Sequence, residues 1–164
     1  MPERRAMAYG LAALVVAADR LTKWLVESHV TAADTIRVIP GFFDIIHSQN
    51  RGVAFGILND SQSSWRTSAL VALSIAAVIF IGVLLWRPEK LSGRSVWGLA
   101  LVLGGAAGNL VDRMVWGRVT DFLEVYVGEY HWPTFNLADS AIVIGSGLLI
   151  LDMLRPKRQA ANVP

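Results

Sequence analysis

Two aspartates flank a polar, aromatic turn in the second half of this 164-residue chain. Asp121 precedes the turn, and Asp139 lies where the next apolar run begins. Two carboxyl groups held close together share one proton, because two like charges in contact cannot both ionise at low cost. The ionised member can act as a general base on water while the protonated member donates to a scissile carbonyl group. Asp121 and Asp139 are therefore candidates for a catalytic pair.

The local sequence leaves a structural role for both aspartates equally open. Asn136 is predicted to be the N-cap of the helix that carries Asp139 in its first turn, where an acid complements the helix dipole. Asp121, like Glu124, fits a solvated acid in a loop. Spacing alone does not decide between these roles and the catalytic pair.

The chain lacks the residue patterns that other catalytic chemistries require. The chain contains no GxSxG or HExxH motif, its three histidines are scattered without ligand spacing, and it has no cysteine. We therefore expect no serine or cysteine nucleophile, no metal site and no cofactor. The net charge of +2 gives no reason to expect a nucleic-acid partner.

The elements that must position the aspartates are apolar helices. Hydrophobic residues make up 54% of the chain and charged residues 17%. Four stretches approach or reach the length of about 20 residues that crosses a bilayer, namely 6–26, 68–86, 96–114 and 138–154. Soluble helices usually keep a polar face, and residues 70–86 have almost none. We predict an all-α integral membrane protein with four transmembrane helices in a single domain, residues 1–164.

Basic residues predict the orientation of these helices. They gather before the first stretch, between the second and third, and after the fourth, which places both termini in the cytoplasm and both long connections outside. Arg4 and Arg5 followed by an apolar run also fit a cleavable signal peptide. The apolar stretch resumes after Lys23, however, and this favours a retained anchoring span.

The first outward connection is predicted to form a small extracytoplasmic β-sheet. Thr35–Ile39 and residues 42–47 are rich in β-branched and aromatic residues, and Pro40-Gly41 marks a turn between them. Residues 61–65 fit a short interfacial helix. Between them, Asn50 and Gly52 either make a turn or offer backbone groups to an extended peptide, and the sequence favours neither interpretation.

Polar residues near the helix ends are candidates for support of the site. Asp19 and Lys23 are four residues apart and share a helix face, either as an interfacial ion pair or, as we favour, as a scaffold for the site. For Asn109 and Arg113 we favour a place near the site over a mere part in a polar interface with Asp112. The nearby glycines, including a Gly104–Gly108 pair, fit close helix packing.

Five ordered blocks resemble the bacterial lipoprotein signal peptidases, also called signal peptidase II. They span almost the whole chain: DRLTK at 19–23, NRGVAF at 50–55, GGAAGNLVDR at 104–113, VTDF at 119–122 and FNLADS at 135–140. This chain departs little from the sequence pattern of the family. Val53 stands where the family more often has alanine, which affects substrate fit, and Thr120 stands where valine is common.

The resemblance implies an aspartic endopeptidase of the bacterial inner membrane with Asp121 and Asp139 as its catalytic dyad, at the periplasmic face. Its substrates would be prolipoproteins whose lipobox cysteine carries diacylglycerol, cut N-terminal to that cysteine. The outer sheet would be the substrate cradle, membrane lipid would surround the enzyme, and globomycin-type peptides would inhibit it. Nothing requires more than a monomer. The resemblance also implies a set of substrate-binding or supporting residues: Asp19, Lys23, Asn50, Gly52, Gly105, Asn109, Arg113, Asn136 and Ala138.

The alternatives are a non-enzymatic transporter subunit or assembly factor and a peptide-binding module without catalysis. A transport path would place ionisable residues along the depth of the spans. Here they gather toward the predicted outer ends, while Asp152 lies at the cytoplasmic end. This distribution favours a site at the depth of the membrane surface.

Overall fold

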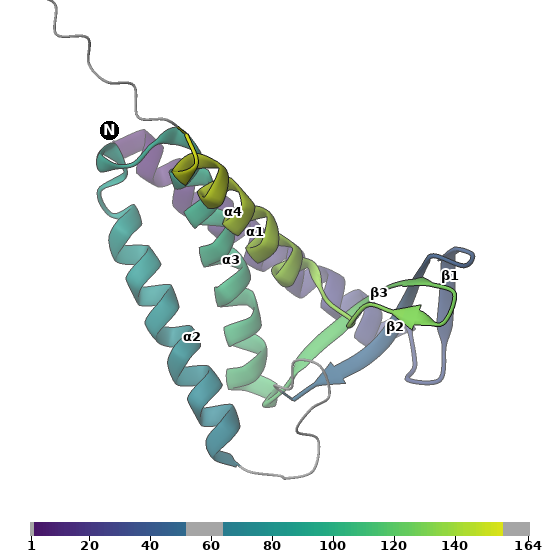
Figure 1. Cartoon of the computed structure of the whole chain (residues 1–164). Helices are drawn as coiled ribbons and strands as arrows, with labels where there is room; N and C mark the ends of the chain where they lie inside the picture. Colours follow the sequence, from purple (N-terminus) through teal and green to yellow (C-terminus); the bar gives the residue numbers. More distant parts are fainter. Residues whose placement is uncertain (1, 52–63, 156–164) are drawn as a thin grey trace, which may run out of the picture.

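Four helices form the body of the computed structural model, which describes residues 2–51 and 64–155 (Figure 1). The central helix is α3, which packs against each of the other three. The N-terminus and the end of α4 lie together, remote from the β-sheet (Figure 1). The helices are α1 (Pro2–His29), α2 (Ser64–Leu85), α3 (Gly93–Trp116) and α4 (Leu137–Met153), with a short 3-10 helix, η2 (Pro88–Lys90), before α3.

The four apolar stretches are all helical, with bounds that differ by a few residues from those expected. Within the described residues, two segments are long and apolar enough to cross a membrane, Ser68–Trp86 and Gly93–Trp116. The α1 helix interrupts its apolar run with charged residues toward its C-terminal end, and α4 is only 17 residues long. The four-span arrangement therefore stays a prediction.

Capping residues explain where two of the helices begin and end. The side chain of Ser92 accepts a hydrogen bond from the backbone N–H of Ser95 at the start of α3, and Gly117 ends that helix in the left-handed region at φ 66°. Asn136 and Asp139 form a capping box at the start of α4, as the sequence predicts for Asn136. This box fixes the first turn of α4 and hence the backbone of Asp139.

Glycines on α3 allow two neighbouring helices to approach it closely. A Cβ on Gly104 would lie 2.7 Å from the backbone oxygen of Ala12 in α1, and one on Gly105 would lie 2.3 Å from that of Ala138 in α4. Both distances are shorter than any normal Cβ contact. The predicted packing role of the glycines is thus confirmed, and α3 is held between α1 and α4 on adjacent faces.

A four-stranded antiparallel sheet lies at one end of the helices (Figure 1). Its strands are β1 (Thr35–Ile39), β2 (Phe43–Asn50), β3 (Val119–Val127) and β4 (Tyr130–His131), in the order β1-β2-β3-β4. The first strand has the expected bounds. The second begins at Phe43 and continues past His47 to Asn50, so Asn50 ends a strand and does not lie in a turn.

The second half of the sheet was not predicted. The sequence predicts no strand within residues 119–127, yet β3 pairs with β2, with Asp121 opposite Ser48 and Val119 opposite Asn50. The result is a mostly helical protein with a small sheet. The expected interfacial helix at 61–65 lies mainly outside the described residues, and α2 begins at Ser64.

We predict that Gly105→Ala destabilises the protein by about 1–3 kcal/mol, because the added methyl group meets the backbone of α4 rather than a movable side chain. The measurement is the thermal unfolding midpoint of the purified protein in detergent micelles. Gly147→Ala is the matched control, since no atom lies within 4 Å of its added Cβ. This control should leave the midpoint unchanged or slightly raised, because alanine favours helix. Equal midpoints for the two variants would contradict the packing described here.

Candidate active site

A single residue, Asn136, contacts both candidate carboxylates. Its side-chain Nδ2 donates to Oδ1 of Asp121 over 2.7 Å, and its backbone N–H donates to Oδ2 of Asp139 over 3.3 Å. Asp121 is the third residue of β3, whereas Asp139 lies in the first turn of α4. Asn136 is fully buried. The strand and the helix therefore present their carboxylates to the same short segment of chain.

A second amide orients each carboxylate. Nδ2 of Asn50 donates to Oδ2 of Asp121 over 3.0 Å, and Nδ2 of Asn109 donates to Oδ1 of Asp139 over 2.8 Å. An ionised carboxylate only accepts hydrogen bonds, so two donors on opposite oxygens fix its plane. Both aspartates are held in this way, and the donors come from β2, α3 and the N-cap of α4.

Burial changes the acidity of Asp121. Asp121 is only 2% exposed, and this burial raises the pKa of its carboxyl group to about 6. The hydrogen bonds from Asn50 and Asn136 and the charge of Lys23 lower this pKa, while the negative charge of Asp139 raises it further. Asp121 therefore gains or loses its proton closer to neutral pH than an ordinary aspartate does.

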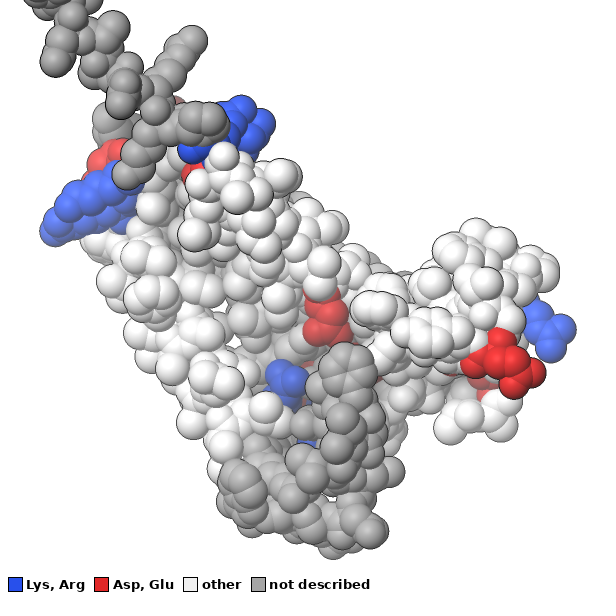
Figure 2. All heavy atoms as spheres, viewed as in Figure 1, with Lys and Arg blue, Asp and Glu red and all other residues white. Residues whose placement is uncertain are grey.

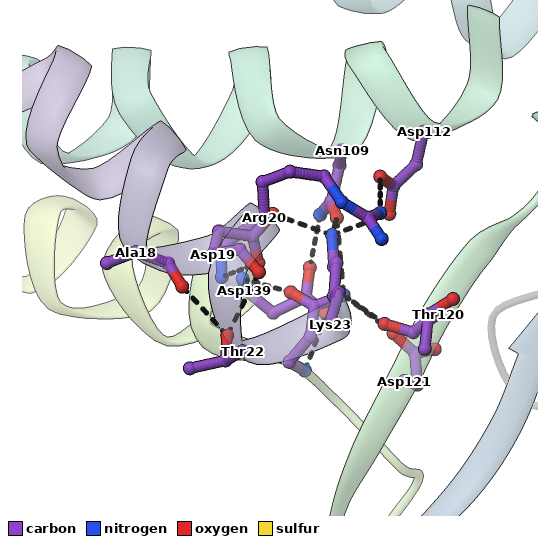
Figure 3. A network of polar contacts seen from close by, with 12 residues as sticks. Ala18, Asp19, Arg20, Thr22, Lys23, Asn109, Asp112, Thr120, Asp121 and Asp139 are labelled. Atoms are coloured by element: carbon purple, nitrogen blue, oxygen red, sulfur yellow. Dashed lines mark hydrogen bonds and ion pairs between the residues drawn. The ribbon is translucent and has the colours of Figure 1, made fainter. Parts of the chain in front are cut away.

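Behind the two aspartates, a buried lysine organises the polar contacts (Figure 3). Nζ of Lys23 donates to Oδ2 of Asp19 over 2.7 Å and to Oδ1 of Asn109 over 2.9 Å, and it lies 2.8 Å from Oδ2 of Asp112. Because the oxygen of the Asn109 amide accepts from Lys23, its NH2 group must face the other way. The NH2 group of Asn109 therefore points toward Asp139.

Asp19 joins this cluster to the start of α4. Its Oδ1 accepts a hydrogen bond from the backbone N–H of Ala138 over 3.0 Å. Ala138 is fully buried and its backbone oxygen faces Gly105. A carboxylate at the N-terminus of a helix also complements the helix dipole. Asp19, Gly105 and Ala138 thus hold the first turn of α4 against α1 and α3.

Four further residues extend these polar contacts, although the sequence did not predict them as site residues: Arg20, Glu27, Asp112 and Thr120. Nη1 of Arg20 lies 3.2 Å from Oδ1 of Asp112, and Arg20 also pairs with Glu27. Oγ1 of Thr120 donates to Oε1 of Glu27 over 2.7 Å. A sequence signal did exist for part of this set: Arg20 and Glu27 are seven residues apart, so they lie two turns apart on one helix face. Asp112 contacts Arg20 and Lys23, not the neighbouring Arg113.

Arg113, a predicted support residue, is not joined to either aspartate within the described part of the chain. The hydrogen bond of Arg113 runs from Nη1 to the backbone oxygen of Asn109 over 3.5 Å, and its buried Nε has no partner among the described residues. Gly52 lies outside the described residues. Across residues 2–51 and 64–155, no group of three or more acidic or histidine side chains is arranged to hold a metal ion.

Comparisons with known proteins agree on one family. The family profile described as "Signal peptidase (SPase) II" matches residues 11–155. A protein named lipoprotein signal peptidase from Solibacter usitatus (strain Ellin6076) is 66% identical over 163 residues, covering 99% of each chain. One with the same name from Syntrophotalea carbinolica is 43% identical over 147 residues, covering 88% of this chain and 89% of the relative.

Solved structures give the same result. A bacterial membrane enzyme determined by the in meso method at 2.3 Å resolution superposes with a TM-score of 0.83 at 28% identity, covering 97% of this chain and 95% of that one. A second such structure, at 1.9 Å resolution, has a TM-score of 0.81 at 29% identity. These matches do not favour a transporter subunit or assembly factor. With the match over residues 11–155, they show that the chain belongs to the signal peptidase II family of peptidases.

Proposed function

We propose that this protein is an aspartic endopeptidase that removes signal peptides from diacylglyceryl-modified prolipoproteins, with Asp121 and Asp139 as its catalytic dyad. Family membership and the names of the relatives support the substrate class. The observation that carries the catalytic assignment is the contact of Asn136 with both carboxylates. One buried residue that bonds both acids holds them in the same site, and the negative charge of Asp139 raises the pKa of Asp121, as expected of two neighbouring carboxylates.

The reaction follows from one proton held by the pair. The ionised carboxylate takes a proton from water, and the water oxygen attacks the carbonyl carbon on the N-terminal side of the lipidated cysteine. The protonated carboxyl group donates its proton to the carbonyl oxygen. When the tetrahedral intermediate collapses, the C–N bond breaks and the leaving amine of the cysteine takes the proton that the first carboxyl group had removed from water. The second carboxylate regains its proton from a hydroxyl group of the intermediate. The pair then returns to its starting state, and no cofactor enters this sequence.

The supporting residues have distinct tasks in this scheme. Asn50 and Asn109 keep the outer oxygens of the two carboxylates oriented, so that each aspartate stays in a productive rotamer. Lys23 and Asp19 act at one remove, through Asn109 and the backbone of Ala138. For Arg113, whose Nε is unpaired among the described residues, we propose a contact with the substrate backbone.

The membrane arrangement is part of the proposal. All four helices would span the bacterial inner membrane, with both termini in the cytoplasm and the dyad and sheet at the periplasmic face. Figure 2 supports this, because charged side chains gather at the two ends of the helices and on the sheet, while the visible face of the helices between them is mostly uncharged. Exposed apolar side chains on α2 and α4, such as Phe80 and Ile144, suit contact with lipid.

Substrate and inhibitor binding follow from that depth. The diacylglyceryl group would keep the substrate cysteine near the headgroups, at the level where β3 meets the start of α4. The strands would cradle the polar part of the substrate, and a globomycin-type cyclic peptide would compete for the same place. A monomer suffices, since both aspartates and all of their donors come from one chain.

We predict that Asp121→Asn and Asp139→Asn each lower the cleavage rate at least about 100-fold, because each removes one partner of the general acid–base pair. The assay follows cleavage of a lipidated precursor by the purified enzyme in micelles, with complementation of cells that lack their own enzyme. Glu129→Gln, at an exposed site in the turn after β3, is the matched control and should keep the parental rate. Parental activity in either aspartate variant would refute the dyad.

We also predict a pH-dependent stability difference between the wild type and Asp121→Asn. The folded-state pKa of Asp121 is raised from 3.8 to about 6, so its stabilising contribution is complete below pH 3.8 and is lost as pH rises through 6. Relative to the variant, the wild type should lose about 2 kcal/mol between pH 4 and pH 7. Thermal unfolding midpoints across this range measure the difference, and one that does not change with pH would contradict the raised pKa.

A further inference from the structure

A polar cavity lies on the face of the sheet opposite Asp121. Its volume is about 240 Å³, and the ends of α1 and α3 close it against strands β2 and β3. Successive strand residues point to opposite faces of a sheet, so Thr120 lines this cavity whereas Asp121 faces Asn50 and Asn136. The cavity, which we call the rear cavity, is therefore separate from the candidate active site. Its lining residues are Glu27, His47, Gln49, Trp116, Arg118 and Thr120.

One side of the rear cavity offers a cation. Arg118 is half-buried and lines the cavity, and its side chain forms no hydrogen bond or ion pair within the described part of the chain. A guanidinium group binds a phosphate through two parallel hydrogen bonds. Gln49, also in the lining, supplies an exposed amide. This side of the cavity suits a phosphate ester.

Another side offers a negative charge. Glu27 ends a connected cluster of three acids and two bases, whose formal charges leave an excess of one negative charge. The cluster consists of Asp19, Asp112, Glu27, Arg20 and Lys23. Glu27 is its most exposed acid, with 31% of its side chain accessible, and its carboxylate retains acceptor capacity beyond its contacts with Arg20 and Thr120.

Two further residues favour an ammonium group beside Glu27. The Trp116 ring stacks on Arg20 at 4.5 Å, yet the residue stays 47% exposed, and an aromatic ring attracts cations. Nδ1 of His47 lies 2.9 Å from the backbone oxygen of Val30, and this oxygen can only accept. Nδ1 therefore carries a proton, and the other ring nitrogen, Nε2, is buried with no partner in the described residues.

The size and position of the cavity indicate what fills it. At about 240 Å³ it is smaller than the roughly 300–1,000 Å³ of pockets for drug-sized molecules, so it suits a headgroup. Trp24 lies one turn before Glu27 on α1 and is 53% exposed, as is typical of residues at the membrane–water interface. We infer that the rear cavity binds the headgroup of a zwitterionic phospholipid, with the phosphate at Arg118 and the ammonium group between Glu27 and Trp116. This inference rests on the proposed membrane arrangement, but not on the catalytic roles of Asp121 and Asp139.

The test measures lipid bound to the full-length protein purified in detergent. Dioleoyl phosphatidylethanolamine and dioleoyl phosphatidylglycerol are added separately, and the lipid retained per protein is counted by native mass spectrometry. Wild-type protein should retain the ethanolamine lipid several-fold better. Arg118→Gln should weaken that retention about tenfold, because it removes a charge-assisted hydrogen bond.

Arg37→Gln is the matched control, because it removes the same charge from the exposed strand β1 and should leave retention unchanged. Thermal midpoints without lipid verify that both variants fold. Wild-type retention in Arg118→Gln, an equal loss in Arg37→Gln, or equal retention of the two lipids would each overturn the inference. Soluble glycerophosphoethanolamine should compete only at large excess. If it displaced the lipid at equal concentration, the occupant would be a free phosphate ester instead of a membrane lipid.

Discussion

The ammonium group of Lys23, fully buried between three helices, is the constraint on which the candidate site depends. An unpaired charge in the interior costs several kcal/mol, so this lysine requires acids around it. Asp19 and Asp112 meet that requirement, and the remaining contact goes to the oxygen of Asn109. The position of one amide follows, and with it the orientation of Asp139. The charge of Lys23 thus determines the orientation of Asp139 through Asn109.

Small residues make room for this charged cluster. A Cβ on Gly108 would lie 2.7 Å from Oδ2 of Asp19, so the carboxylate occupies the space that a side chain would otherwise fill. Gly105 likewise allows the first turn of α4 to reach α3. Close helix packing and the polar cluster are therefore one arrangement. The sheet then adds Asp121 from a strand whose opposite face forms the rear cavity, so that β3 serves both sides.

Local patterns in the sequence predict much of this fold. Long apolar runs indicate the four helices, the β-branched run at Thr35–Ile39 indicates β1, and the Asn136–Asp139 spacing indicates the cap of α4. Strand β3 was missed because its partner, β2, lies about 70 residues earlier, and no local pattern specifies such a pairing. The links from Arg20 to Asp112 and from Glu27 to Thr120 were missed for the same reason. The resemblance to the family identified the site residues, and the structure identified the hydrogen bonds that join them.

Catalysis by Asp121 and Asp139 requires one proton shared by two fixed carboxylates. The titration of Asp121 itself tests this requirement most directly. Carbon-13-labelled aspartate gives carboxyl signals that shift on ionisation, and the signal absent from Asp121→Asn identifies this residue. We expect the Asp121 signal of the folded protein to titrate with a pKa of about 6. A signal that completes its titration near the ordinary aspartate value of about 4 would show that burial does not raise the pKa of Asp121, and would contradict its assignment as a carboxyl group that holds a proton in the buried site.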